Sequence, residues 1–173
     1  MHGQADESLH VVYLGLGSNL GDRDANLAAA IQALAELVTV ERVSSVYDTA
    51  PLHVTDQPRF HNLVCQATTD LTPPALLRAA KAIERHLGRA DGRRYGPRVI
   101  DIDVLLYDSL VLQTDELTVP HPRTAERAFV LAPLAEIAPL LVHPVLGETM
   151  PFLLSHLAES DVRRVGPLPQ LER

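Results

Sequence analysis

The chain alternates between two hydrophobic patterns. In four segments apolar residues are dense or follow a period of about two, and in two longer segments they recur every three or four positions. The first pattern is typical of β-strands and the second of amphipathic helices. The predicted strands cover residues 9–16, 38–47, 60–69 and 99–107. The predicted helices run through residues 27–37 and 76–87, with Asp22 or Asp24 as the expected N-cap of the first and Thr72 as that of the second.

The order of these elements is strand, helix, strand, strand, helix, strand. This order predicts an α+β protein with a ferredoxin-like βαββαβ antiparallel sheet and helices packed on it. Residues 111–112 and 117–119 form a predicted extra C-terminal hairpin, and residues 128–138 and 150–158 form two predicted short helices. We expect a single domain over residues 1–173 with its core at about 9–158, and loose order in residues 1–8 and 162–173.

Composition excludes several classes of protein. The formal net charge of −7 argues against non-specific binding of nucleic acid or of anionic membrane surfaces. The single cysteine, Cys65, allows no internal disulfide and no thiolate cluster, and it is expected in the core. The sequence has no apolar run as long as a membrane span, and its N-terminus lacks the layout of a signal peptide. We therefore expect a cytoplasmic protein.

The stretch from residue 87 to 105 carries the most informative chemistry. In the predicted strand Asp101 and Asp103 point to one face, while the apolar residues that alternate with them fill the core behind. Adjacent carboxylates repel each other unless a cation lies between them. Oxygen ligands suit Mg²⁺, which takes one or two carboxylates and leaves its other sites to water and substrate phosphates. The alternative is a solvated face, which is common for an Asp-x-Asp on a half-exposed strand.

Four arginines precede this strand in a glycine-containing loop: Arg89, Arg93, Arg94 and Arg98. Planar guanidinium groups match the geometry of phosphate oxygens. In an acidic chain such a cluster indicates a focused anion site. The carboxylate pair, a divalent metal and the arginines together predict transfer of a phosphoryl-type group from a nucleotide.

Two further segments allow more than one interpretation. The glycine-rich turn at residues 17–22 lies between a predicted strand and helix and could hold a phosphate. It matches neither GxGxxG nor a P-loop with its lysine, so a plain tight turn is the simpler interpretation. The connection at residues 48–60 is long for a compact domain, and such loops are usually functional or disordered.

Several motifs together resemble one enzyme family. They are Gly-Ser-Asn-Leu-Gly at 17–21, a proline loop with Thr49, Pro51 and Leu52, Phe-His-Asn at 60–62, Gly-Arg at 88–89, Tyr-Gly-Pro-Arg-Val-Ile-Asp-Ile-Asp at 95–103, Leu-Thr-Val-Pro-His-Pro at 117–122 and Glu-Arg-Ala-Phe-Val at 126–130. Over residues 11–147 the chain resembles the 6-hydroxymethyl-7,8-dihydropterin pyrophosphokinases of folate biosynthesis. The Gly-Pro-Arg-x-x-Asp-x-Asp block is the most specific of these motifs.

The resemblance implies transfer of pyrophosphate from ATP to the hydroxymethyl group of the dihydropterin, with AMP as the second product. It implies two Mg²⁺ ions held by Asp101 and Asp103, and Arg89, Arg98 and Asp103 as catalytic residues. We further hypothesise that Asp103 orients or deprotonates the pterin hydroxyl. ATP and the dihydropterin are the expected partners, without nucleic acid or membrane, and a monomer is expected with a dimer as the alternative.

The other site residues are carried over from the family position by position. The pterin pocket would be lined by Thr49, Ala50, Leu52, Phe60, Asn62, Asp101 and Phe129, with Phe60 and Phe129 on the two faces of the ring. ATP would be held by Lys81, Glu84, Arg89, Arg93, Arg94, Tyr95, Arg98, Val104, Thr118, His121 and Arg127. Before the resemblance is considered, ordinary strand and core packing explains Asn62 and both phenylalanines equally well.

Two other functions fit parts of the pattern. A nucleotidyltransferase also pairs a Gly-Ser turn with an Asp-x-Asp strand, but in that class the two lie close in sequence. Here Ser18 and Asp101 are more than eighty residues apart. A non-catalytic ferredoxin-like ligand-binding module would be expected to lack the carboxylate pair or the arginines. The products distinguish the enzymes, because a pyrophosphokinase releases AMP and a nucleotidyltransferase releases pyrophosphate.

Overall fold

The computed structural model of the chain describes residues 8–88, 97–158 and 160–171. Its strands are β1 (His10–Ser18), β2 (Thr39–Val43), β3 (Val46–Thr49), β4 (Phe60–Thr69), β5 (Asp101–Tyr107), β6 (Leu112–Gln113), β7 (Thr118–Val119) and β8 (Val162–Gly166). Its helices are α1 (Arg23–Ala35), α2 (Pro73–His86), α3 (Ala128–Ile137) and α4 (Met150–Ser155), with short 3₁₀ helices η1 (Thr124–Glu126) and η2 (Pro169–Leu171). In this described part of the chain, no helix is long and apolar enough to cross a membrane.

One antiparallel sheet dominates the fold. Its strands lie in the order β5-β1-β4-β3-β8, and β2 also pairs with β4. β6 and β7 form a separate hairpin, as the sequence predicts. The α+β class and the antiparallel arrangement of the sheet are therefore confirmed.

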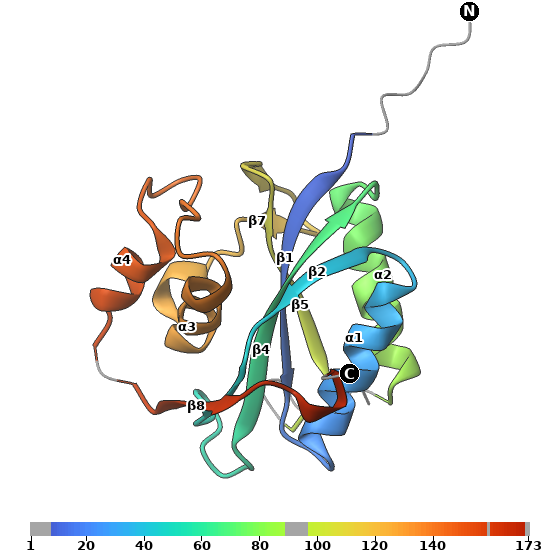
Figure 1. Ribbon diagram of the computed structural model, residues 1–173, viewed down its shortest axis with the longest axis vertical. Coiled ribbons are helices and arrows are strands. Elements are labelled where there is room, and N and C mark those ends of the chain that lie inside the picture. Colours follow the sequence, from blue (N-terminus) through green and yellow to red (C-terminus); the bar gives the residue numbers. More distant parts are fainter. Residues whose placement is uncertain (1–7, 89–96, 159, 172–173) are drawn as a thin grey trace, which may run out of the picture.

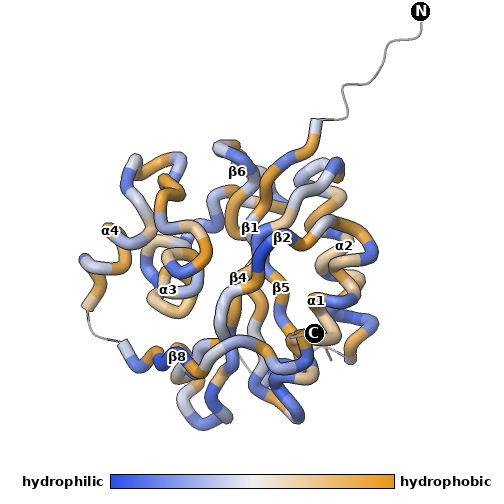
Figure 2. Tube along the Cα trace, viewed as in Figure 1, coloured by the Kyte–Doolittle hydropathy of each residue, from blue (hydrophilic) through white to orange (hydrophobic). Residues whose placement is uncertain are grey.

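The sheet separates two hydrophobic cores (Figure 1). Leu14 and Leu16 of β1 point to one face, where α1 and α2 close the first core. Tyr13 points to the opposite face with Val64 of β4 and Leu105 of β5, and α3 and α4 cover this second core. In Figure 2 the hydrophobic colour runs through the central strands and the helices beside them. The alternation along β1 thus supplies both cores from one strand.

Side-chain caps explain where the first two helices begin. A carboxylate oxygen of Asp22 accepts a hydrogen bond from the Ala25 N–H (3.1 Å), and Oγ1 of Thr72 accepts one from the Ala75 N–H (3.3 Å). Each cap satisfies an amide donor that the first helical turn leaves without a partner. Both caps were predicted, and the structure selects Asp22 over Asp24 for α1.

The expectation of one strand over residues 38–47 is wrong, because the segment is divided into β2 and β3. The break falls at Ser44 and Ser45. The Ser44 N–H still donates to the carbonyl of Val64 (2.9 Å), but the Ser45 N–H donates to the carboxylate of Glu136 on α3 (2.6 Å). This contact joins residues 91 positions apart in the sequence. A tertiary interaction therefore divides the strand.

The prediction of loose order from residue 162 onward is wrong for β8, which pairs antiparallel with β3 at the outer edge of the sheet. Just before β8, the carbonyl of Asp161 accepts a hydrogen bond from the Ala50 N–H (3.3 Å). Its carboxylate accepts one from the guanidinium of Arg59 (2.6 Å). These contacts hold both ends of the β3–β4 loop (residues 50–59). Residues 1–7 and 172–173, for which loose order is also predicted, lie outside the described residues.

Candidate active site

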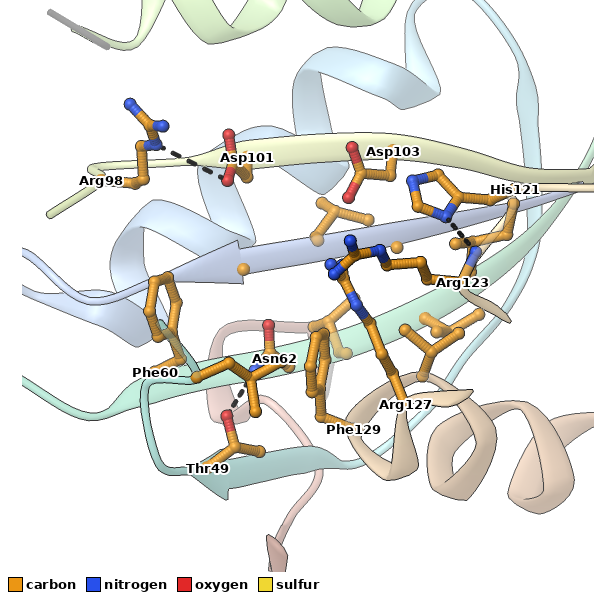
Figure 3. A pocket seen from close by; sticks show the side chains of 18 of the residues that line it. Thr49, Phe60, Asn62, Arg98, Asp101, Asp103, His121, Arg123, Arg127 and Phe129 are labelled. Atoms are coloured by element: carbon orange, nitrogen blue, oxygen red, sulfur yellow. Dashed lines mark hydrogen bonds and ion pairs between the residues drawn. The ribbon is translucent and has the colours of Figure 1, made fainter. Parts of the chain in front are cut away.

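A pocket of about 400 Å³ opens on the sheet face that carries α3 and α4. Its walls come from β1, β4, β5, the β3–β4 loop, α2, the segment after β7 and the start of α3. The sequence-predicted site residues that line it are Thr49, Ala50, Leu52, Phe60, Asn62, Lys81, Arg98, Asp101, Asp103, His121, Arg127 and Phe129. Figure 3 shows the carboxylates of β5 on one side of the pocket and aromatic and amide side chains on the other.

Two glycines of β1 form the floor of this pocket. The strand register places Gly17 between Asp101 of β5 and Asn62 of β4, and it places Gly15 beside Asp103. Neighbouring strands lie about 4.8 Å apart, so the backbones that flank Gly17 are separated by about 10 Å without a side chain between them. A Cβ atom at Gly17 would lie 2.5 Å from Oδ1 of Asn62. Glycine keeps this space open because any side chain would collide with Asn62.

The acidic side of the pocket is carried by β5. Asp101 and Asp103 line the pocket, while Ile102 between them is fully buried, as the strand alternation predicts. Nε of Arg98 lies 3.8 Å from Oδ2 of Asp101. The outer edge of β5 is also fixed, because Oε1 of the buried Glu84 on α2 accepts a hydrogen bond from the Ile102 N–H (2.8 Å). Both carboxylates therefore stand on a strand that is held from β1 and from α2.

Basic side chains continue the wall beyond Asp103. His121 and Arg127 line the pocket together with Arg123, and Lys81 reaches it from α2. Burial lowers the pKa of His121 from its ordinary value of 6.5. The positive charges of Arg127, Arg123 and Lys81 lower this pKa further, whereas the negative charge of Asp103 raises it. The imidazole is therefore neutral at pH 7, with one nitrogen that donates a hydrogen bond and one that accepts.

The opposite side of the pocket is built from neutral groups. Nδ2 of Asn62 donates a hydrogen bond to Oγ1 of Thr49 (2.7 Å), and both side chains are buried. Phe60 and Phe129 stand on either side of Asn62 in Figure 3. The guanidinium of Arg127 lies over the Phe129 ring, 5.5 Å from its centroid. A fixed amide between two aromatic rings favours a flat ligand with a polar edge.

Three residues assigned to ATP by resemblance are not part of the pocket wall. Glu84 lies behind β5, Val104 belongs to the core on the opposite face of the sheet, and Thr118 pairs with Gln113 in the hairpin. Four further assigned residues, Arg89, Arg93, Arg94 and Tyr95, lie outside the described residues. The roles of all seven stay predictions.

The pocket also contains residues that the sequence reasoning did not assign to the site. They include the core residues Leu16, Leu63, Val64, Leu105 and Val130, and also Gly15, Gly17, His53, Gln57, Pro122 and Arg123. The glycines leave a signal, because Gly15 and Gly17 replace every second side chain after Tyr13, although the predicted strand ended at residue 16 and Gly17 was assigned to the turn. Such a strand marks a place where a ligand approaches the backbone closely. His53 and Gln57 belong to the β3–β4 loop, and the length of that loop was their signal.

Comparisons with known proteins indicate one family. The sequence model described as 7,8-dihydro-6-hydroxymethylpterin-pyrophosphokinase matches residues 13–139. A protein of Methylorubrum extorquens named 2-amino-4-hydroxy-6-hydroxymethyldihydropteridine pyrophosphokinase is 48% identical over 155 residues, which are 88% of this chain and 97% of that protein.

Other relatives are much longer than this chain. The mitochondrial folate synthesis bifunctional protein of Pisum sativum is 49% identical over 127 residues, which are 73% of this chain and 25% of that protein. The chain spans between 21% and 25% of the first four curated relatives it matches. Among solved structures, wild-type HPPK-DHPS of Plasmodium falciparum has a TM-score of 0.71 at 16% identity, covering 86% of this chain and 44% of that one. At this identity the likeness shows a shared fold.

Proposed function

Because the chain belongs to the 7,8-dihydro-6-hydroxymethylpterin-pyrophosphokinase family, we propose that it transfers pyrophosphate from ATP to the hydroxymethyl group of 6-hydroxymethyl-7,8-dihydropterin. The products are the pterin diphosphate and AMP, within folate biosynthesis. One observation carries the proposal. The same pocket contains a carboxylate pair on one side and a fixed amide between two phenylalanines on the other. Gly17 alone separates Asp101 from Asn62 across the sheet. This arrangement supports a reaction between a phosphate donor and a flat ring.

The pterin ring is assigned to the space between Phe60 and Phe129. Asn62 carries donors and an acceptor on one side chain, so it can recognise the amide-like edge of the pterin. Thr49 supports this role because its hydroxyl fixes the orientation of Asn62. Ala50 and Leu52 would close the pocket from the β3–β4 loop, and Asp101 would face the ring from β5.

ATP is assigned to the basic side of the pocket. Lys81, His121 and Arg127 line that side, and Arg98 lines the pocket beside Asp101, which supports contacts of all four with the triphosphate. The other assigned contacts rest on the resemblance to the family: Glu84, Arg89, Arg93, Arg94, Tyr95, Val104 and Thr118.

The residues present fit Mg²⁺ as the metal of this reaction. Asp101 and Asp103 offer oxygen ligands from one pocket wall. Within the described residues, no group of three or more His, Cys, Asp and Glu side chains could hold a metal ion. An incomplete protein shell suits Mg²⁺, which keeps water and substrate phosphates among its ligands. We propose two ions at this carboxylate pair, which would supply neutralisation of phosphate charge when bound.

The proposed transfer forms a bond between the pterin hydroxymethyl oxygen and the β-phosphorus of ATP. It breaks the bond from the β-phosphorus to the oxygen bridging the α-phosphate, and that oxygen leaves with AMP. Asp103 is assigned to orient the pterin hydroxyl and to accept its proton. Arg89 and Arg98 are assigned to stabilise charge on the non-bridging oxygens, which requires accurate placement rather than covalent chemistry.

The proposal extends to the architecture. The order β5-β1-β4, with β2 and β3 beyond β4 and with α1 and α2 on one face, supports a ferredoxin-like description of the sheet. A single domain is supported because every described strand outside the β6–β7 hairpin joins this one sheet. We propose that the domain acts as a monomer.

Product analysis tests the proposed function. The protein is incubated with 6-hydroxymethyl-7,8-dihydropterin, ATP and Mg²⁺, with the Asp101→Ala variant beside it. AMP and pterin diphosphate from the wild type alone are the expected result. Release of pyrophosphate instead of AMP would indicate a nucleotidyltransferase. Absence of turnover by folded protein that still binds ATP would favour a ligand-binding module.

A further inference from the structure

Asn19 in the turn between β1 and α1 makes hydrogen bonds to two separate segments of the site. Its backbone N–H donates to the Arg98 carbonyl (3.0 Å), and its Oδ1 accepts a hydrogen bond from the Arg98 N–H (2.6 Å). Its Nδ2 donates to Oε1 of Gln57 (2.9 Å) and to the carbonyl of Pro58 (3.0 Å). The residue is only 1% exposed.

Neither of the two segments has regular secondary structure to hold it. Residues 97–100 lie outside any strand, and the pairing of β5 with β1 ends at Asp101 and Gly17. Gln57 and Pro58 lie in the β3–β4 loop, after β3 has ended and before β4 begins. Asn19 therefore supplies the backbone partners that a sheet would otherwise provide.

Both segments deliver side chains to the pocket. The side chain of Arg98 lines the acidic side, with Nε 3.8 Å from Asp101, and Gln57 lines the pocket from the β3–β4 loop. Asn19 itself does not line the pocket, because its polar side-chain atoms all face Arg98, Gln57 and Pro58. These hydrogen bonds give the turn at residues 17–22 a structural role, so a bound phosphate is not needed to account for it.

We propose that Asn19 is a positioning residue for the transfer reaction, because it holds Arg98 and the end of the β3–β4 loop against one rigid turn. This inference rests on the proposed function and adds a residue to it. The two ends of its amide act on different halves of the site. Oδ1 fixes the backbone that aims Arg98, and Nδ2 fixes the loop that closes the pterin side.

Two substitutions separate these halves. Asn19→Asp keeps an acceptor for the Arg98 N–H but places a carboxylate oxygen against the two acceptors Gln57 Oε1 and Pro58 O. We expect the KM for the pterin to rise about tenfold while kcat changes little. Asn19→Ala removes both ends of the amide, so kcat is also expected to fall by about 10²-fold, the cost of a small misplacement of a catalytic group.

Asn26→Ala is the matched control for a purely structural role. Asn26 donates from Nδ2 to the carbonyl of Leu20 (2.7 Å) and to Oγ of Ser18 (3.2 Å), so these hydrogen bonds stabilise the same turn and go to neither segment. We expect it to lower the melting temperature with little change in kcat or KM. The inference is overturned if Asn26→Ala reproduces the kinetic losses of Asn19→Ala, or if both Asn19 variants keep wild-type constants.

Amide hydrogen exchange gives a second readout that does not need catalysis. The Arg98 amide is expected to stay protected in the wild type and in Asn19→Asp, and to exchange faster in Asn19→Ala. Amides of the β3–β4 loop are expected to exchange faster in both variants. Equal protection of Arg98 in all three proteins would overturn the inference. Absence of AMP production by the wild type would instead refute the proposed function. The exchange of the Arg98 and β3–β4 loop amides would then still show whether Asn19 holds both segments.

Discussion

The two sides of the pocket are organised in different ways. On the β4 side, Asn62 and Thr49 are buried and already hydrogen-bonded to each other at 2.7 Å. On the β5 side, Asp101 is partly exposed, with 35% of its side-chain surface accessible, and the nearest guanidinium nitrogen of Arg98 is 3.8 Å away. The β4 side is thus shaped before a ligand arrives, whereas the β5 side concentrates charge that cations and phosphates would balance.

This difference shows how one sheet face can support two kinds of recognition. Shape and fixed hydrogen bonds select a ring at little cost in ordering, since the side chains are already held. Charged groups at the pocket wall act at longer range and depend on ions. Substitutions on the β5 side should therefore change turnover, and those on the β4 side should change affinity for the pterin.

The largest expected effect is that of Asp101→Ala on the β5 side. Loss of one of the two carboxylates proposed as metal ligands should lower kcat by about 10²–10³-fold, the range seen when a preorganised electrostatic contact is removed. The melting temperature should not fall, because the substitution removes repulsion between neighbouring carboxylates. AMP release and thermal unfolding measure the two quantities. Asp115→Ala, an exposed acid between β6 and β7, is the matched control. Wild-type AMP release by Asp101→Ala would contradict the comparison.

Asn62→Ala should show the opposite pattern on the β4 side. Removing the amide leaves a buried polar edge of the pterin unpaired, at a cost of about 1–3 kcal/mol. Since 1.4 kcal/mol is tenfold in affinity, the KM for the pterin should rise by roughly 10–100-fold. The KM for ATP should stay within about twofold, because the ATP contacts are assigned to the other wall. Steady-state kinetics with each substrate varied in turn measures both, and equal changes in the two constants would show that the sides are not separate.

Gly17→Ala tests the boundary between the two sides. The new Cβ would lie 2.5 Å from Oδ1 of Asn62 and 3.7 Å from Cδ1 of Phe60, so the amide must rotate away from Thr49. We expect a smaller rise in the KM for the pterin, by about tenfold, because the amide is displaced rather than lost. Gly15→Ala is the matched control, since the atoms nearest to its Cβ belong to the side chain of Leu105, the closest at 3.3 Å. A larger rise in the KM for the pterin from Gly15→Ala would show that the part of the pocket floor beside Asp103 matters more than the part beside Asn62.

The smallest effect concerns the acid stability of the β4 side. The guanidinium of Arg59 lowers the pKa of Asp161 below its ordinary value of 3.8, chiefly by hydrogen bonding. A depressed carboxyl pKa stabilises the fold above the unfolded-state value and loses that contribution as the pH falls through the folded-state value. The melting temperature of the wild type should therefore exceed that of Asp161→Asn slightly at pH 7, and the difference should begin to shrink near pH 3.8 and be lost as the pH falls through the lower pKa of the folded state. Thermal unfolding across pH 3–7 measures it; a difference that persists unchanged at pH 3 would rule out this pairing.

Local patterns were sufficient for most of the fold. The caps at Asp22 and Thr72, the strand β4 and the β6–β7 hairpin depend on neighbouring residues, and each was predicted. The division of β2 from β3 was missed because it depends on Glu136, which is remote in sequence. β8 was missed for a similar reason: its arginines and flanking prolines do not resemble a strand, and its partner β3 supplies the pairing.

For the site, the pairing of Asp101 with Asp103 on one face followed from strand geometry alone. The place of Asn62 across Gly17 could not be read without the register of three strands. The same holds for Asn19, whose role depends on where two irregular segments pass the turn. Sequence patterns show which face a side chain occupies, but tertiary contacts decide what it meets there.

The contacts that Asp161 makes with the β3–β4 loop have a consequence for the order in which parts of the protein are completed during synthesis. The residues that Arg59 and Asp161 bring together are 102 positions apart in the sequence. A ribosome adds about 5–20 residues per second, so Arg59 at the end of the β3–β4 loop is translated about 5–20 s before Asp161. β5 and its carboxylates are added within that interval, before Asp161, so the β3–β4 loop still lacks one of its supports when β5 is complete. The nascent chain therefore receives the carboxylates of the β5 side before the last support of the loop on the β4 side.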